Sequence, residues 1–177
     1  TLFMPNRGEV SFASLQKESD VIDFFNTHFS DVLPLLENFP QTYFENSTGR
    51  LTTVYANNWH RNNLCLIGDA AHAVVPFFGQ GMNASFEDCD VLMDCIKNGG
   101  DNWSEIFESY NKTRKPDADA IAKMAIENYI EMRDSVAQPD YILRKKIAHA
   151  LNKKFPDTFI PRYNMVSFSS TPYSLVY

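Results

Sequence analysis

Several features that define common classes of protein are missing from this sequence. Its 177 residues contain only 3 cysteines and no Cys-x-x-Cys pair, so neither a disulfide framework nor a zinc site is predicted. We read these cysteines as reduced thiols of an intracellular protein. No run of about 18 apolar residues occurs, so no membrane span is predicted within this chain.

Motifs for independent nucleotide binding and for hydrolysis are also missing. Neither a Gly-x-Gly-x-x-Gly fingerprint nor a Gly-x-x-x-x-Gly-Lys-Ser/Thr loop is present, so a complete nucleotide-binding fold is not encoded. Without a Gly-x-Ser-x-Gly elbow or a His-Glu-x-x-His pair, a hydrolase would lack its nucleophile or its metal. The net charge of −6 comes without a basic run, which makes nucleic acid the least favoured partner.

Aromatic side chains, by contrast, are abundant. They make up 14% of the residues, with 14 Phe and 8 Tyr, and this content suits a pocket for a flat ligand. The chain starts at Thr1 without an initiator Met and stops at Tyr177 without a polar tail. We therefore expect it to be a portion of a longer polypeptide.

The pattern of apolar residues predicts a mixed α/β chain. Strand-like runs occur at 1–4, 10–15 and 51–56, and the apolar run 64–67 is typical of a short buried strand. Helical periodicity covers 19–29, 82–96, 103–113, 117–133 and 141–152, with Pro116 dividing the third helix from the fourth. The stripe Met82, Phe86, Met93 and Ile96 is expected in the core, and Glu105, Glu108, Lys112, Arg114 and Lys115 on a solvated face.

The segment 68–83 has the chemistry of a ligand site. Gly79 and Gly81 let the backbone approach a ligand closely, and the helix that follows begins with unpaired N–H groups and a partial positive charge. Such a start attracts a phosphate or the edge of a reduced flavin. Asp69, after a strand, is placed to accept hydrogen bonds from a sugar or ribityl hydroxyl. The alternative is a simple turn with an Asx hydrogen bond.

These residues resemble a known family. The run Cys65 to Ala73, followed by Pro76 and by Gly79 to Asn83, is similar to the second FAD motif of the class A flavoprotein aromatic hydroxylases. The resemblance implies an FAD site made by Gly68, Asp69, Pro76, Gly79, Gln80, Gly81, Met82 and Asn83. It implies that Asp69 binds a ribityl oxygen and that the backbone of 81–83 faces the isoalloxazine and the pyrophosphate.

A narrower resemblance covers nearly the whole chain. The segments 75–83, 128–133 and 158–166 are together similar to the kynurenine 3-monooxygenase branch of that class. This narrower resemblance implies that Asn128 and Tyr163 hold the carboxylate of L-kynurenine. It also implies that Phe77 and Gln80 lie beside the substrate ring and that Met132 lines the pocket.

The same resemblance implies the reaction and the missing parts. NADPH would reduce FAD, oxygen would add to form a flavin C4a-hydroperoxide, and no side chain of this chain would act as a catalytic acid or base. An N-terminal half with the Gly-x-Gly-x-x-Gly unit would complete the FAD site. Eukaryotic members are held at the mitochondrial outer membrane by a later tail that this chain lacks.

The expected organisation has three parts. Residues 1–60 would end a substrate-domain sheet, 61–115 would form the strand, loop and helix of the FAD site, and 116–177 a helical region beside the substrate. Two alternatives remain: another class A aromatic hydroxylase, or a non-catalytic binding module that keeps the fold. His72 is expected to be a packed, hydrogen-bonded core residue rather than a catalytic one.

Overall fold

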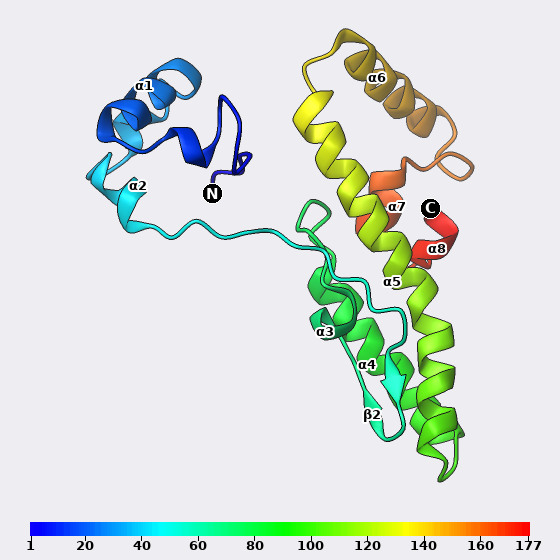
Figure 1. Cartoon of the computed structure of the whole chain (residues 1–177). Coiled ribbons are helices and arrows are strands. Elements are labelled where there is room, and N and C mark those ends of the chain that lie inside the picture. Colours follow the sequence, from blue (N-terminus) through cyan, green and yellow to red (C-terminus); the bar gives the residue numbers. More distant parts are fainter. The chain divides into compact units, whose positions relative to one another are not determined.

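The computed structural model describes residues 1–177 and is largely helical (Figure 1). The chain forms two compact units, residues 1–50 and residues 51–177. The first unit contains the 3₁₀ helices η1 (Phe12–Ser14) and η2 (Leu33–Leu35) and the helices α1 (Glu18–His28) and α2 (Gln41–Glu45). The second contains the strands β1 (His60–Arg61) and β2 (Leu64–Cys65) and the helices α3 (Asp69–His72), α4 (Gly81–Asn98), α5 (Trp103–Asp134), α6 (Pro139–Lys154), α7 (Arg162–Phe168) and α8 (Tyr173–Val176).

The first unit is built on α1, whose prediction is confirmed. Asp20 caps its start by accepting the backbone N–H of Lys17 at 3.0 Å, and Val21 is fully buried. Phe25 packs on Phe39 with ring centroids 4.8 Å apart. The strands expected at 1–4 and 10–15 are wrong, because this unit contains no strand and residues 12–14 form η1. A strand needs a paired neighbour, and the unit supplies none.

The only sheet is a two-stranded hairpin. β1 and β2 are antiparallel, with His60 opposite Cys65, and they run for two residues each. The prediction of a buried strand at 64–67 is wrong in its burial, since Leu64 is 61% exposed and Ile67 37% exposed. Residues 51–56 are not a strand, although Val54 donates its N–H to the carbonyl of Ala73 at 2.8 Å. The predicted α/β class is therefore present only in part: the structure is mostly helical and contains one small hairpin.

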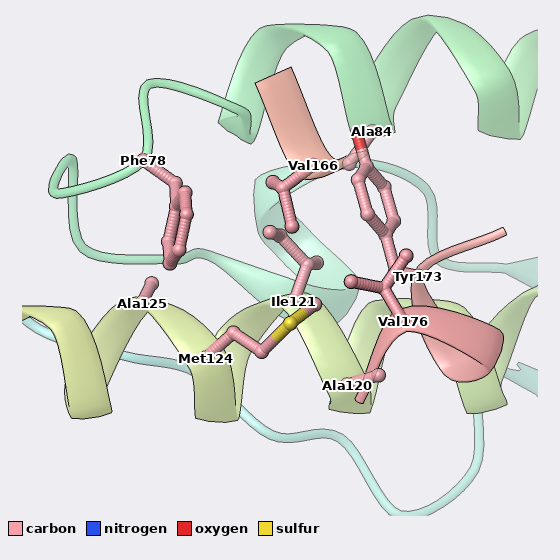
Figure 2. Packing of buried hydrophobic residues seen from close by; sticks show 9 residues of the cluster. All are labelled: Phe78, Ala84, Ala120, Ile121, Met124, Ala125, Val166, Tyr173 and Val176. Atoms are coloured by element: carbon pink, nitrogen blue, oxygen red, sulfur yellow. The ribbon is translucent and has the colours of Figure 1, made fainter. Parts of the chain in front are cut away.

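The core of the second unit forms where α4, α5 and α8 meet. Figure 1 shows α4 beside α5 and α8 against the middle of α5, and α7 contacts α5 through the ion pair of Arg162 with Glu127 at 2.9 Å. Small residues on α4 and α5 bring the two helices close together, and Figure 2 shows Phe78 of the preceding loop over Ala125 of α5. The buried cluster consists of Phe78, Ala84, Ala120, Ile121, Met124, Ala125, Val166, Tyr173 and Val176.

The face of α4 that the sequence assigned to the core is exposed. Met82 is 67%, Phe86 62% and Met93 50% exposed, so the prediction that this stripe is core is wrong for these three residues, while Ile96 is half-buried. The helix instead turns Ala84 and Asp88 toward α5, one helical turn apart. The buried stripe is therefore the one that contains a carboxylate. None of the helices combines the length and the apolar character needed to cross a membrane.

Pro116 does not divide two helices, as the sequence predicted; it lies inside the continuous helix α5. A proline in a helix interior removes one backbone hydrogen bond and crowds the preceding turn, at a cost of about 3 kcal/mol. Packing on both sides of the proline offsets this cost, because Tyr110 and Arg114 before it and Ala118 and Ile121 after it are buried. Asn102 also fixes the start of the helix by accepting the N–H groups of the first turn.

We expect Pro116→Ala to raise the free energy of unfolding by about 1–3 kcal/mol, because it restores an N–H for the carbonyl of Lys112. The measurement is chemical denaturation of the purified protein. Glu108→Ala, at an exposed position of the same helix, is the control and is expected to shift stability by less than about 0.5 kcal/mol. A loss of stability in Pro116→Ala would contradict this account of α5.

Candidate functional site

The site begins at Gly68, where the chain turns from β2 into α3. Gly68 is buried with φ +59°, and its carbonyl accepts the N–H groups of Ala71 and His72 at 2.8 and 3.0 Å. A side chain here would be strained by that φ and would meet Ser85 Oγ at 3.1 Å. Asp69, the next residue, is exposed and begins α3. The predicted Gly-Asp pair thus turns a carboxylate outward from a fixed backbone.

Asp88 of α4 holds this turn from inside. Its Oδ2 accepts the N–H of Gly68 at 3.0 Å and lies 2.5 Å from Nε2 of His72, and its Oδ1 accepts Nε of Arg114 at 2.9 Å. All three side chains are almost completely buried, with Asp88 0%, His72 3% and Arg114 3% exposed. The ring of Trp59 packs on His72 with centroids 5.0 Å apart. The prediction that His72 is a packed, hydrogen-bonded core residue is confirmed.

The network keeps Asp88 ionised. Burial alone would raise the pKa of Asp88, but hydrogen bonds from His72, Arg114 and the N–H of Gly68 outweigh it and lower the pKa. Burial works against the charge of Arg114 as well, yet its contacts with Asp88, Glu87 and Asp117 raise its pKa. Since an ionised carboxylate only accepts, His72 donates from Nε2. One buried ion network thereby joins the turn at Gly68 to the helices α3, α4 and α5.

The glycine loop leads from α3 into α4. The N–H of Gly79 donates to the carbonyl of Pro76 at 3.0 Å, which makes a tight turn, and Gly79 has φ +67°. No atom lies within 4 Å of the point where a Cβ of Gly79 would stand. Gly81 then begins α4, with Met82 exposed beside it. The loop therefore presents bare backbone to open space.

The first turn of α4 fits the flavin that the sequence predicted. Gln80, at the N-cap, makes no side-chain cap, and the first turn carries no acidic residue, so its N–H groups keep their positive potential. The 18-residue helix α4 begins here, and the space beside Gly79 is open. A planar ring with acceptor atoms or negative charge on one edge suits such a surface. The exposed carboxylate of Asp69 adds an acceptor for hydroxyl groups.

The predicted substrate residues gather around the same loop. Asn128 of α5 donates from Nδ2 to the carbonyl of Phe77 at 2.7 Å and lies 3.8 Å from Sδ of Met132, one turn further along α5. Tyr163 of α7 stacks on Phe78 with ring centroids 5.5 Å apart. Phe77, Asn128 and Met132 are therefore brought together, and Tyr163 joins them through its contact with Phe78.

Gln80 has a different environment from the other predicted residues. It is only 7% exposed, and its Oε1 accepts the hydroxyl of Tyr173 at 3.0 Å and Nδ2 of Asn83 at 2.8 Å. Asn83 is itself exposed and lies in the first turn of α4. The side chain of Gln80 thus points into the protein and links the loop to α8.

Sequence reasoning missed three residues of this site. Arg114 was expected on a solvated face, and this prediction is wrong because the guanidinium is 3% exposed. Asp88 and Tyr173 were not singled out. Asp88 had a signal: Ala84, Asp88, Leu92 and Cys95 form a helical stripe in which one acidic residue stands among apolar ones. Tyr173 had none, because its partner Gln80 lies 93 residues away.

This arrangement agrees with comparison to known proteins. The model of the family described as "FAD binding domain" matches residues 17–125, and the chain belongs to this family. Among its relatives, the kynurenine 3-monooxygenase of Cytophaga hutchinsonii is 47% identical over 98% of this chain and 39% of the relative. That of Myxococcus xanthus is 46% identical over 100% and 38%, and that of Dictyostelium discoideum 42% over 98% and 41%. The resemblance predicted from the sequence is confirmed.

A solved structure is similar in fold alone. The tetracycline destructase Tet(51) superposes with a TM-score of 0.52 and 21% identity, over 93% of this chain and 43% of that protein. The chain spans about two fifths of the length of the curated relatives, as the coverage of 38% to 41% shows.

We expect Asp88→Asn to lower the free energy of unfolding by about 3 kcal/mol, because it leaves the buried Arg114 without its closest anion. The measurement is chemical denaturation at neutral pH. Asp94→Asn removes the exposed partner of Lys97 on the same helix and is the matched control, with little change expected. Equal stability of Asp88→Asn and the parent protein would contradict a structural role for the network.

The same variant changes the acid response. A lowered pKa means that folding stabilises the ionised form of Asp88, so this contribution is complete above the ordinary aspartate value of 3.8 and is lost as the pH falls through the folded pKa. As the pH falls below 3.8, the Asn variant should therefore lose less stability than the parent protein, which chemical denaturation at a series of pH values measures.

Proposed function

We propose that this chain is part of an FAD-dependent monooxygenase that uses NADPH and O₂ to hydroxylate L-kynurenine to 3-hydroxykynurenine. One observation carries the proposal: the hydrogen bond of 2.7 Å from Asn128 to the carbonyl of Phe77. It joins the loop that leads to the uncapped start of α4 to the helix that bears two of the predicted substrate residues. Cofactor and substrate residues thereby meet at one loop, as a hydroxylase requires.

The residues of this chain would hold the isoalloxazine half of FAD. Asp69 would accept a hydroxyl of the ribityl chain, and the backbone of Gly81, Met82 and Asn83 would face the ring and the pyrophosphate. Pro76 and Gly79 would shape the loop beside them. Bound FAD supplies hydride acceptance from NADPH and the activation of O₂. The role of the chain is to bind the cofactor, to favour negative charge at the helix start and to exclude water.

The substrate would lie against the loop and α5. Phe77 and the exposed thioether of Met132 offer apolar surface to an aromatic ring, and the buried amide of Gln80 sets the loop beside it. The phenol of Tyr163, 46% exposed, and the amide of Asn128 are donors for a carboxylate. One N–H of the Asn128 amide donates to the carbonyl of Phe77, and the other, now directed at the weak acceptor Sδ of Met132 at 3.8 Å, would donate to the substrate carboxylate instead.

The rest of the cofactor site would come from an N-terminal segment. This chain has no Gly-x-Gly-x-x-Gly unit, and it spans about two fifths of its relatives, from 38% to 41%. We propose that such a segment of the same polypeptide binds the adenine and pyrophosphate half of FAD. A test of the cofactor site therefore requires the complete polypeptide, in which that segment would precede this chain.

The test of the proposed function is NADPH oxidation by the FAD-loaded polypeptide with and without L-kynurenine, while the product is followed by mass. Oxidation stimulated by kynurenine, with a product heavier by one oxygen atom, is expected. Flavin reduction that ignores kynurenine would favour another aromatic hydroxylase. If the polypeptide binds FAD but NADPH does not bleach it, the non-catalytic module gains support.

We expect Asp69→Ala to weaken FAD binding about tenfold or more, because it removes a charged hydrogen-bond acceptor for the ribityl chain. The dissociation constant is measured by quenching of flavin fluorescence. Asp90→Ala, which removes an exposed carboxylate from α4, is the control with unchanged affinity. Identical affinities of the two variants would argue against the role of Asp69.

We expect Asn128→Ala to raise KM for L-kynurenine about tenfold or more, because a donor to the carboxylate is lost, with a smaller change in the FAD dissociation constant. Steady-state kinetics and the fluorescence titration measure the two effects. Asn152→Ala removes another amide that donates to a backbone carbonyl, that of Phe159, and is expected to leave KM unchanged. An unchanged KM in Asn128→Ala would remove this residue from the substrate site.

A further inference from the structure

The loop that would face the flavin is held from three helices of the C-terminal part. Asn128 of α5 binds the carbonyl of Phe77, and Tyr163 of α7 stacks on Phe78. Tyr173 of α8 donates its hydroxyl to Oε1 of Gln80 at 3.0 Å. Of these contacts, only the hydrogen bond from Tyr173 reaches Gln80, the residue that immediately precedes α4.

Gln80 couples this contact to the backbone of the site. Its Oε1 also accepts Nδ2 of Asn83 at 2.8 Å, so the same oxygen joins α8 to the first turn of α4. Gly79, one residue earlier, has the left-handed φ of +67°, and nothing within 4 Å of its Cβ position restrains it on the open side. The orientation of residues 79–83 therefore depends on the buried amide of Gln80.

Tyr173 is well suited to fix that amide. The residue is only 5% exposed, and Figure 2 shows its hydroxyl end beside Ala84 of α4, in the same cluster as Val166 and Val176. Burial raises the pKa of Tyr173 to about 12, with Glu87 adding to the rise and Arg114 opposing it, so the phenol keeps its proton. A packed ring with a permanent donor holds Gln80 in one orientation.

We propose that Tyr173 is a positioning residue for the flavin, which acts through Gln80 to set the backbone of Gly79 to Asn83 in the geometry that binds the isoalloxazine. This inference rests on the proposed function. It makes the short helix α8 a part of the cofactor site, although Tyr173 lies 93 residues after Gln80 in the sequence. Nothing in the sequence of α8 itself indicates a role in the cofactor site.

The fold should survive the loss of this hydrogen bond. Tyr173→Phe keeps the ring in the apolar cluster, and Asn128 and Tyr163 still hold the loop at residues 77 and 78. The amide of Gln80 then keeps Asn83 as its donor but loses its anchor to α8. The consequence is a backbone that samples more orientations at the flavin, with an intact tertiary structure around it.

The experiment compares Tyr173→Phe with Tyr177→Phe in the complete polypeptide. Tyr177 lies at the end of α8, and its hydroxyl donates to Glu127 at the surface, which makes it a matched control for the loss of one phenol. The readouts are the FAD dissociation constant, the visible spectrum of bound FAD and the amount of product per NADPH oxidised. Thermal unfolding verifies that both variants are folded.

For Tyr173→Phe we expect FAD binding about fivefold weaker, the equivalent of one neutral hydrogen bond, with a shifted flavin spectrum and less product per NADPH. Tyr177→Phe should match the parent protein in all three. Gln80→Leu removes the same acceptor and should reproduce the loss; with Tyr173→Phe it should be non-additive, and it replaces that variant if the latter fails to fold.

The outcomes separate the two proposals. A parent polypeptide that binds FAD and responds to kynurenine, together with a Tyr173→Phe variant of unchanged affinity and spectrum, would overturn the role of Tyr173 alone. Additive effects of Gln80→Leu and Tyr173→Phe would overturn it as well. A parent polypeptide without FAD binding would overturn both the proposed function and this inference.

Discussion

The buried carboxylate of Asp88 is the constraint on which the second unit depends. It lies on α4, faces Arg114 of α5, and accepts the N–H of Gly68 at the start of α3, so one side chain joins three helices. Removing two charges from water is costly, and that cost is recovered only while every partner stays in place. The network therefore permits one relative position of α4 and α5. That position also fixes the conformation of the turn at Gly68 and the outward direction of the Asp69 carboxylate.

The glycine loop is the second consequence of this arrangement. Fixed at one end by α3 and at the other by α4, it needs only a few contacts to define its shape: Asn128 with Phe77, Tyr163 with Phe78, and Tyr173 with Gln80. All three contacts come from the chain after the loop, so the C-terminal helices shape the surface that we propose binds the cofactor, as well as the proposed substrate pocket. The similarity to a kynurenine 3-monooxygenase extends over 98% of the chain and so includes these C-terminal helices.

The sequence predicted the local features of the site and missed its long-range ones. The glycine pattern located the loop, and the apolar period at 82–96 located α4, because both are encoded by neighbouring residues. The exposed stripe of Met82 and Phe86 was misplaced, because two apolar faces compete on α4 and periodicity does not identify which one meets α5. The break expected at Pro116 failed because packing around Tyr110 and Ile121 exceeds the cost of a lost hydrogen bond. Strands at 1–4 and 51–56 were wrong because a strand depends on partners that local sequence does not specify.

The backbone of Gly79 to Asn83 and the turn at Gly68–Asp69 form the surface that we propose meets FAD. Hydrogen–deuterium exchange of the complete polypeptide, with and without FAD, measures this directly, because the first N–H groups of α4 lack helical partners and exchange freely until a ligand covers them. We expect FAD to slow exchange at residues 79–83 and 68–69 and to leave the exposed helix α6 unchanged. Protection confined to other segments of this chain, or none within it, would contradict the account.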